Sequence, residues 1–554
     1  MQQVESPLAV ADRPANSGIR PSLAVAMVAF VPRLLTAGHH LTYDEIVWMQ
    51  RTVRYSDALT TLDLAGMTAA RGDQVATLPG VPTMIVGSAA RLAYGIGGRI
   101  GLSGDEPFSR AWSGLHSAQL MMAITTSLLI GLLVWLTWHW LGAVPALTAG
   151  VLLATEPLMV AHGAVLHTDE LLGLLGACTV VLLARLLGRG GPPPSRPTAM
   201  AVAAGVLAGL TALTKLSSAA FVPGVALLVG WVAWRRIVAA RRTGASRRLG
   251  LASVLEPVAT IVLVGAATIA VLWPALVVAP GDQLGVLRTS ANLADAGQFG
   301  VFRGELTFAP PAVFYFVTTP FRMTPWFLIA TLILVPVALA DRGRRRQVAS
   351  LLVVIVGVVV VLTLTPKKID RYIVEVVPLL AVLVGIGAAS ALDLLRGGRL
   401  GTRARHLVER HRRGLRLASA AVVVGVVGHS VLVAPWGGIY FNPLLGGSTA
   451  AEQRLVVGWG EGIRAAGDLI ARRENGDCAD LRVAMGFPFF DRAIPCGHPT
   501  PTSRQADYRI VYINDRQLDF SGRVAEFRAT HTPIAEVRER GVLLAEIYDL
   551  RQPG

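Results

Sequence analysis

Two adjacent carboxylates, Asp44 and Glu45, directly follow the first apolar segment of the chain, residues 21–38. If that segment spans a membrane, the pair lies at the membrane surface, where ionisable side chains are costly unless they face a watery cavity or have a task. The pair therefore indicates the mouth of an active site. The alternative is a helix that begins here and carries both acids in its first turn, where the helix dipole favours them.

A second acidic pair, Asp169 and Glu170, opens another apolar segment just after His167. The helix dipole offers the same alternative here. On the functional interpretation, Asp169 reaches the cavity beside Asp44 and binds acceptor, sugar or a divalent cation. His162 and His167 with these acids match no firm metal-ligand spacing, so we predict no metal site, although a divalent cation stays open as a cofactor.

Basic residues stand at the ends of other apolar segments and could hold an anion: Lys215, Lys367, Lys368 and Arg371. Each has a structural alternative. The three lysines can extend along helix ends towards water, and Arg371 can pair with Asp370 or Glu375.

The composition decides what kind of element carries these residues. Of 554 residues, 53% are hydrophobic and only 16% charged, and the mean hydropathy is +0.53. These values predict a multi-spanning membrane protein. The formal net charge of +15 comes from short basic clusters between apolar runs, which is typical of membrane topology rather than of a nucleic-acid-binding face. No cleavable signal is evident before the first apolar segment.

Eleven apolar segments are long enough to cross a bilayer, which takes about 20 helical residues. They are 21–38, 115–138, 142–161, 170–188, 199–213, 217–235, 254–279, 325–341, 347–366, 372–395 and 416–436. With eleven spans and a cytoplasmic N-terminus, the arginine clusters within 185–196, 235–248, 342–346 and 396–416 all lie on the cytoplasmic side, as the positive-inside rule requires. The stretch 311–321, interrupted by prolines, is predicted as a re-entrant or surface piece.

The opposite face then holds the unusual polar residues. In the first external loop, 39–114, helical periodicity predicts two interfacial amphipathic helices, at 44–62 and 81–96. Residues 437–554 alternate short strand-like runs with polar helices and predict a small external α/β domain. Cys478 and Cys496 flank its first strand, as a disulfide or as two thiols. The predicted division is a cytoplasmic tail (1–20), a transmembrane domain (21–436) and the external domain (437–554).

An enzyme on the external face has no cytosolic nucleotides, so its substrate must arrive through the membrane on a lipid. Transfer of a sugar from a polyprenyl phosphate needs a carboxylate that takes the proton of the acceptor hydroxyl and cations that hold the phosphate. Asp44 is the candidate base and Glu45 its helper. The phosphate holders are the four basic residues named above.

Seven motifs in order make the chain resemble the membrane glycosyltransferases of the C-type (GT-C) fold, the relatives of dolichyl-phosphate-mannose protein mannosyltransferases and lipid A aminoarabinose transferases. They are Tyr43-Asp44-Glu45, Leu78-Pro79-Gly80-Val81-Pro82-Thr83, His167-Thr168-Asp169-Glu170-Leu171-Leu172, 208–215, Pro366-Lys367-Lys368 with Arg371-Tyr372, 440–447 and Gly458-Trp459-Gly460-Glu461-Gly462. The stretch from Phe302 to Pro325 is similar to an external loop of bacterial members.

The resemblance implies a polyprenyl- or dolichyl-phosphate-linked donor, inverting transfer, Asp44 as the base, and basic residues at external helix ends as phosphate holders. Two features depart from the family. Leu78 stands where bacterial relatives often have a histidine, and the tail after Trp436 is unlike the additions of the protein mannosyltransferases, so a protein acceptor does not follow.

We therefore expect an all-α polytopic membrane protein of the GT-C fold that transfers a sugar to a lipid, glycan or protein acceptor outside a bacterial cytoplasmic membrane. The excess of Arg over Lys suggests a bacterium of high GC content. The rivals are a transporter or flippase of lipid-linked sugars, which needs no base, and a non-catalytic scaffold. Candidate site residues are Asp44, Glu45 and Asp169 for catalysis, Lys215, Lys367, Lys368 and Arg371 for the phosphate, and Tyr43, His167, Glu170 and Tyr372 for acceptor or sugar.

Overall fold

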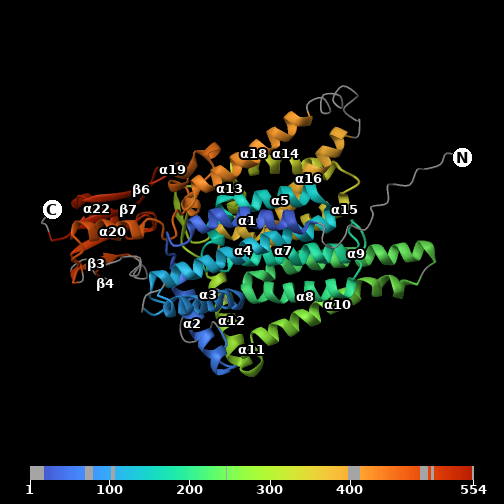
Figure 1. Ribbon diagram of the computed structural model, residues 1–554, viewed down its shortest axis with the longest axis horizontal. Helices are drawn as coiled ribbons and strands as arrows, with labels where there is room; N and C mark the ends of the chain where they lie inside the picture. The colour runs from blue at the N-terminus through green and yellow to red at the C-terminus, as the bar shows by residue number, and fades with distance from the viewer. Residues whose placement is uncertain are drawn as a thin grey trace.

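The computed structural model describes residues 18–68, 79–101, 106–244, 246–396, 412–478, 480–486, 497–500 and 505–551. Long helices run side by side as one bundle, and a small sheet near the C-terminus lies at one end of it (Figure 1). We call this the sheet end of the bundle. The turn between α9 and α10 lies at the opposite end (Figure 1).

The bundle is built from helices that coincide with the apolar segments of the sequence. They are α1 (Ile19–Thr36), α4 (Trp112–Leu141), α5 (Ala143–Thr155), α6 (Pro157–Gly163), α7 (Asp169–Leu186), α8 (Pro197–Thr214), α9 (Phe221–Thr243), α10 (Arg247–Leu272), α14 (Pro325–Ala340), α15 (Arg345–Leu364), α16 (Val377–Arg396) and α18 (Arg412–Val433). Each of the eleven predicted segments contains at least part of a helix, so the polytopic helical fold is confirmed.

Fewer than eleven helices of the described chain are long and apolar enough to be complete spans, because several helices are short or bent. In the described part of the chain, seven helices are long and apolar enough to cross a membrane, or nine if the bent pairs α5–α6 and α18 with 436–445 each form one span. Helix α14 is apolar but short, and α7 carries two acids in its first turn. The count of eleven stays a prediction.

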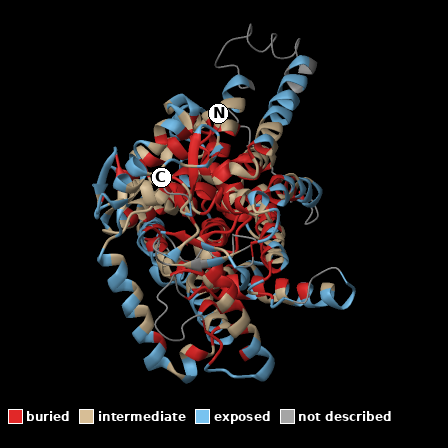
Figure 2. Cartoon of the chain, turned by 90° about the vertical axis from the view of Figure 1, so that its left-hand side faces the viewer, coloured by how far each residue is buried: buried red, intermediate tan, exposed pale blue. Residues whose placement is uncertain are grey.

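Burial separates the inside of the bundle from its lipid-facing rim. Figure 2 shows buried residues gathered in the middle and exposed ones on the outer helices. Helix α5 packs against α1, α4 and α16, and α7 packs against α4 and α8. The most apolar 18-residue window of α10 is only 17% buried, with Val262 and Leu263 exposed. An outer face of this kind suits lipid, where apolar side chains need no cover.

Shorter elements cover the sheet end. Helices α2 (Tyr43–Thr61) and α3 (Val81–Arg99) pack on each other and confirm the two helices predicted in the first loop. The remaining short elements are η1 (Leu216–Ala220), α11 (Ala275–Val278), α12 (Pro280–Asp295), the β1 (Gly300–Phe302) and β2 (Glu305–Thr307) hairpin, α13 (Phe314–Arg322) and η2 (Asp370–Glu375). Helix α13 occupies most of the stretch predicted as a re-entrant or surface piece.

The C-terminal sheet region follows η3 (Trp436–Ile439) and η4 (Pro443–Leu445). Its five strands lie in the order β4-β3-β5-β7-β6, with β3 parallel to β4 and β5, and β7 antiparallel to β5 and β6. Helix α20 packs on β6 and β7. The elements are α19 (Gly447–Glu452), α20 (Ile463–Arg473), β3 (Arg482–Met485), β4 (His498–Thr500), β5 (Tyr508–Tyr512), α21 (Ile513–Gln517), α22 (Arg523–Thr530), β6 (Ala535–Glu539) and β7 (Val542–Asp549).

The small C-terminal α/β fold is therefore present as predicted. Three predictions fall outside the described residues: the departure at Leu78, the Cys496 half of the predicted disulfide, and the part of the arginine cluster before α18 that lies within 397–411.

Candidate functional site

Helix α2 begins at the sheet end because Thr42 and Glu45 form a capping box. The Thr42 hydroxyl accepts a hydrogen bond from the Glu45 backbone N–H, and the Thr42 N–H donates to the Glu45 carboxylate at 2.9 Å. This reciprocal cap satisfies two backbone donors at the helix start. It also determines that Asp44, one residue earlier, leaves the helix in a different direction.

Asp44 faces a group of charged side chains. Its carboxylate lies 2.9 Å from the Arg371 guanidinium and 3.5 Å from His167 Nε2. The Asp44 side chain is 23% exposed. The carboxylate therefore lies at the edge of the buried region, where an incoming hydroxyl can reach it.

Glu45 points into the protein. Besides the cap, its carboxylate accepts hydrogen bonds from the Gln119 amide and from the backbone N–H of Leu166, both at 2.9 Å. It is fully buried. The structure therefore does not bring Glu45 beside Asp44 as a catalytic helper. Glu45 instead ties α2 to α4 and to the loop that carries His167.

The second acidic pair divides in the same manner. Asp169 lies 2.7 Å from Lys215 Nζ, 3.4 Å from His167 and 3.6 Å from Arg371. Glu170 turns away and pairs with Arg33 of α1 at 2.7 Å, with both side chains buried. Glu170 is thus not placed for the predicted sugar or acceptor contact, since it links α7 to α1.

Lys215 stands in the break between α8 and η1, where the backbone is extended. Its ammonium contacts Asp169 and, at 3.4 Å, Glu375, and it lies 3.9 Å above the Tyr372 ring. Ser217 donates to the same Glu375 at 2.7 Å. Lys215 is almost fully buried, so its charge is already balanced by protein carboxylates.

Arg371 comes from η2, which lies directly against α7. The close approach depends on Gly173, where a Cβ would come within 2.6 Å of the Val374 carbonyl oxygen. Any larger residue would push η2 away from α7. The approach brings Arg371 between Asp44 and Asp169.

These contacts define the polar cluster, in which residues from five parts of the chain meet at the sheet end. Its members are Asp44, His162, His167, Asp169, Lys215, Arg371, Tyr372, Glu375 and Trp459. Three of these, His162, Glu375 and Trp459, were not among the candidate site residues predicted from the sequence. His162 was considered only for a metal site. Glu375 appeared only as a possible partner of Arg371, and the signal for Trp459 was its place in Gly458-Trp459-Gly460-Glu461-Gly462.

Opposite charges control the protonation of Asp44. Burial by itself would raise its pKa, but Arg371 and His167 outweigh burial and hold the pKa of Asp44 well below its ordinary range. In turn, burial would lower the pKa of His167, but Asp169 and Asp44 raise it overall. Asp44 is therefore ionised at neutral pH and available to accept a proton.

Two further lysines lie near the cluster without a carboxylate partner. Among the described residues, no ion pair involves Lys367 or Lys368, and both side chains are half-buried. Burial lowers the pKa of Lys367, and the nearby charges of Arg371 and Lys215 lower it further, while Asp44 opposes them. Tyr43 is also half-buried at the start of α2.

Several buried polar atoms of the cluster make ion-pair contacts but no hydrogen bond. Within the described part of the chain, buried atoms that lack one include Asp44 Oδ2, His162 Nδ1, His167 Nε2, Asp169 Oδ2 and Arg371 Nε. Buried polar groups in proteins are nearly always satisfied. Here each of these atoms instead lies 2.9 to 3.9 Å from an ion-pair partner, so the cluster offers groups of both signs to a polar ligand.

A metal ion fits these residues poorly. No group of three or more His, Cys, Asp or Glu residues among those described has a geometry suited to a metal ion. Asp44 and Asp169 each have a cationic side chain within 3 Å, which a divalent cation would have to displace.

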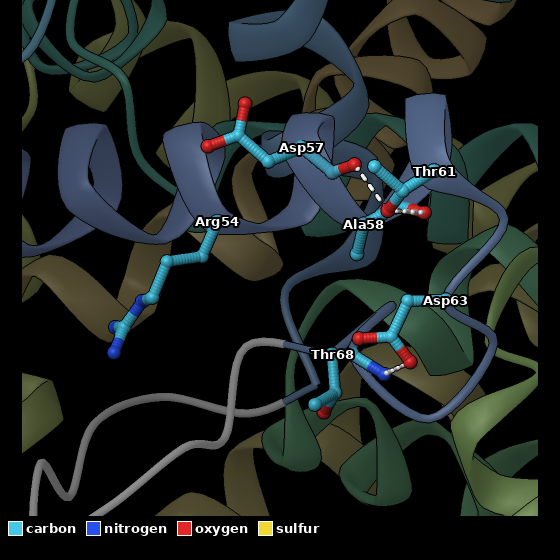
Figure 3. A pocket seen from close by; sticks show the side chains of 7 residues that line it. Arg54, Asp57, Ala58, Thr61, Asp63 and Thr68 are labelled. Atoms are coloured by element: carbon cyan, nitrogen blue, oxygen red, sulfur yellow. Dashed lines mark hydrogen bonds between the residues drawn. The ribbon is translucent and has the colours of Figure 1, made fainter.

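A separate pocket lies elsewhere. It has a volume of about 230 Å³ and opens between the last turns of α2 and the following turn, lined by Arg54, Asp57, Ala58, Thr61, Asp63, Gly66 and Thr68. Figure 3 shows these side chains around the pocket. It includes no member of the polar cluster, so the chemistry indicated by Asp44 does not take place there.

Comparisons with known proteins support the architecture. No protein-family model and no curated protein sequence matches the chain. A similar solved structure is ArnT from Cupriavidus metallidurans bound to undecaprenyl phosphate, with 16% identity, a TM-score of 0.50, and coverage of 96% of this chain and 97% of that one.

A second similar structure is the oligosaccharyltransferase of Archaeoglobus fulgidus tethered to an acceptor peptide. Its identity is 12% and its TM-score 0.50, and the match covers 95% of this chain and 74% of that one. Both proteins are membrane glycosyltransferases of the C-type fold. The match along nearly the whole chain confirms the fold expected from the sequence motifs: this protein has the C-type glycosyltransferase fold.

Proposed function

We propose that this protein is a glycosyltransferase that moves a sugar from a polyprenyl-phosphate-linked donor to an acceptor hydroxyl, with inversion. The observation that carries the proposal is Asp44, a partly exposed carboxylate held ionised at the edge of a cationic cluster. The fold shared with two membrane glycosyltransferases supports the same reaction class.

Asp44 acts as the general base. It takes the proton of the acceptor hydroxyl as the acceptor oxygen forms a bond to the anomeric carbon of the donor. The bond between that carbon and the phosphate oxygen breaks, and its electron pair goes to the phosphate. Attack from the face opposite the leaving phosphate inverts the anomeric centre. The proton held by Asp44 then leaves to water.

Arg371, Lys367 and Lys368 hold the phosphate. Negative charge grows on the phosphate as the sugar leaves, and positioned cations stabilise that charge in the transition state. Lys367 and Lys368 are the better placed for a new anion, because neither is paired with a carboxylate of the described chain. Arg371 reaches Asp44 and so connects the phosphate end of the site with the base.

Asp169 and Lys215 form the floor of the site. Lys215 is enclosed by Asp169, Glu375 and Tyr372, so we assign it to fixing Asp169 rather than to the phosphate. Asp169 then orients His167 and Arg371 around Asp44. Tyr43, half-buried next to the base, and Tyr372 are the candidate contacts for sugar or acceptor.

The neighbours' ligands fit this assignment. ArnT from C. metallidurans binds undecaprenyl phosphate, a donor carrier of the kind proposed here. We place the protein in a bacterial cytoplasmic membrane, with the polar cluster and the C-terminal sheet region on the external face. That orientation follows from the arginine clusters of the sequence.

The test is transfer of radiolabel by purified protein in detergent, from polyprenyl-phosphate mannose or arabinose to a crude envelope acceptor. Wild type is compared with Asp44→Asn and with Asp57→Asn, a matched change on the same helix whose side chain is 59% exposed and outside the cluster. We expect transfer by wild type and Asp57→Asn only.

Other outcomes would change the assignment. Transfer by Asp44→Asn at the wild-type rate would remove Asp44 as the base. Donor binding by every variant without transfer from any donor would favour the transporter or flippase, which has no need for a base. Reconstitution in vesicles with a fluorescent lipid-linked sugar would then measure movement across the bilayer.

A further inference from the structure

The C-terminal sheet region sends one side chain into the polar cluster, that of Trp459. The Arg371 guanidinium lies over the Trp459 ring, 4.2 Å from its centroid. The rings of His162 and His167 lie at 5.2 and 5.1 Å, the latter edge to face. The indole of Trp459 therefore contacts three members of the cluster, although its chain neighbours hydrogen-bond to the sheet region.

The loop that carries Trp459 is held by the sheet. The backbone N–H of Trp459 donates to the Glu461 carboxylate at 2.5 Å. The next N–H, of Gly460, donates to the hydroxyl of Tyr512 at the end of β5. Gly458 has a φ of +93°, and a Cβ there would lie 2.5 Å from the Tyr512 hydroxyl. The loop conformation thus requires glycine and depends on β5.

Arg371 has two carboxylates within reach, so a further contact is needed to hold its guanidinium between them. It lies 2.9 Å from Asp44 on one side and 3.6 Å from Asp169 on the other. A long arginine side chain has many rotamers, and either acid alone would draw it away from the other. A flat aromatic face attracts the guanidinium without competing for its hydrogen-bond donors.

We propose that Trp459 is a positioning residue, which holds Arg371 between Asp44 and Asp169 so that the C-terminal sheet region completes the catalytic cluster. The kinetic part of this proposal rests on the proposed function, whereas the placement of Arg371 does not. The alternative is that Trp459 merely fills space, in which case an apolar residue of similar bulk would replace it.

The first test measures the position of Arg371 without any transfer reaction. Folded protein in detergent is treated with phenylglyoxal, which modifies accessible arginines, and the rate at Arg371 is followed by peptide mass spectrometry. We expect a several-fold faster rate in Trp459→Leu than in wild type, and a rate within about twofold of wild type in Trp459→Phe, since phenylalanine keeps an aromatic face.

A matched control removes another Arg–Trp contact. Arg189 lies over Trp231 at 4.5 Å in a different part of the bundle, and Trp231 is 41% exposed. Trp231→Leu should leave the modification of Arg371 unchanged. Equal rates at Arg371 in folded Trp459→Leu and wild type would overturn the proposal.

A second variant guards against a failure of Trp459→Leu to fold. Tyr512→Phe removes the hydroxyl that holds Gly460 and leaves every side chain of the cluster in place. It should speed the modification of Arg371 less than Trp459→Leu does. Trp459 would be assigned to packing only if two results came together. The modification rate at Arg371 would be unchanged in Tyr512→Phe, and it would be the same in Trp459→Leu as in Trp459→Phe.

The second test uses the pH dependence of transfer. The charged and titratable groups that face Asp44 are Arg371, Lys367, His167, Tyr43 and Arg51. If Arg371 is no longer held, the pKa of Asp44 rises, so Trp459→Leu should lose activity at a higher pH than wild type on the acid side. Trp459→Phe should restore the wild-type limb.

The two tests separate two kinds of failure. If wild type transfers no sugar from any donor, the proposed function fails, and the modification rates still decide whether Trp459 positions Arg371. If transfer occurs but the acid limb and the rate at Arg371 are both unchanged in Trp459→Leu, the positioning role is wrong while the function stands.

Discussion

Helices α2 and α7 begin in the same way, and in each of them the two first-turn acids have different roles. Both carry an acidic pair in the first turn, Asp44-Glu45 and Asp169-Glu170. In each pair the aspartate faces the polar cluster, and the glutamate turns into the packing between helices. Successive residues of an α-helix differ by about 100° in direction, so in α2 and α7 the aspartate and the glutamate leave the helix start in different directions.

The two glutamates are buried, and each has partners that stabilise its carboxylate in the packing between helices. Glu45 accepts hydrogen bonds from two backbone N–H groups and one amide, and Glu170 is paired with Arg33. The two aspartates instead contact cationic side chains of the polar cluster, Asp44 at Arg371 and Asp169 at Lys215 and Arg371. What distinguishes the two kinds of acid here is therefore where their partners lie, in the polar cluster for the aspartates and in the packing between helices for the glutamates.

The comparison predicts the largest effect at Asp44. Asp44→Asn should lower the transfer rate by roughly 10²- to 10⁴-fold, the usual contribution of a general base, with little change in melting temperature. Glu45→Gln should do the reverse, keeping the rate per folded molecule within a few-fold and lowering the melting temperature, since an amide cannot accept all three bonds. Similar rate losses in both variants would contradict the division of the pair.

A smaller loss of rate is expected at Asp169. Asp169→Asn leaves Lys215 with Glu375 alone and removes the 3.6 Å contact to Arg371. A misplacement of this kind costs about 10²-fold. Single-turnover rates and donor affinity, measured on the same preparation, distinguish a slower transfer step from weaker binding of the lipid donor. Weaker donor binding with a normal rate would show that Asp169 serves the lipid and not the base.

At Glu170 the effect should appear in stability. Glu170→Gln leaves the Arg33 charge buried without a carboxylate, and breaking such a pair costs about 3–5 kcal/mol. Thermal unfolding in detergent should show a clear drop, whereas Glu526→Gln on the exposed face of α22 should not. Replacing both partners, Arg33→Met with Glu170→Leu, should recover much of the loss. Unchanged stability combined with lost transfer would move Glu170 into the site.

The smallest effect is expected from His167. Its imidazole lies 3.5 Å from Asp44, and the two carboxylates beside it raise its pKa. The base must be ionised, so activity is lost as the pH falls through the pKa of Asp44. His167→Gln removes one of the groups that lower this pKa, and the acid limb should move upward by less than about one pH unit. His498→Gln, exposed on β4, is the control, and a downward shift in His167→Gln would be inconsistent with the charge arrangement.

Much of this arrangement could be predicted from the sequence. Hydropathy located every apolar segment, and the spacing of Asp44, His167, Asp169, Lys215 and Arg371 between those segments predicted that they would meet at one end. The role of Glu45 was also accessible, because Thr42 and Glu45 have the capping-box spacing. This is the alternative in which the two acids belong to the first turn of a helix, and for Glu45 the structure agrees with it.

Other features depend on contacts that no local pattern encodes. The partner of Glu170 is Arg33, on a helix more than a hundred positions earlier, and only the rotation of two packed helices brings them together. In the sequence Lys215 has no carboxylate nearby, but in the structure it pairs with Asp169 and Glu375. Trp459 enters from a region whose strands have no counterpart in the bundle. Such residues become visible only when the helices are assembled.

The polar cluster draws on positions as far apart as Asp44 and Trp459. During synthesis Asp44 leaves the ribosome early, whereas Trp459 emerges only after every described helix of the bundle has been made, and β5, which anchors the loop around Trp459, emerges later still. A nascent chain therefore holds no complete polar cluster. A chain released before β5 would have all of these helices and still lack the support that places Trp459 against Arg371.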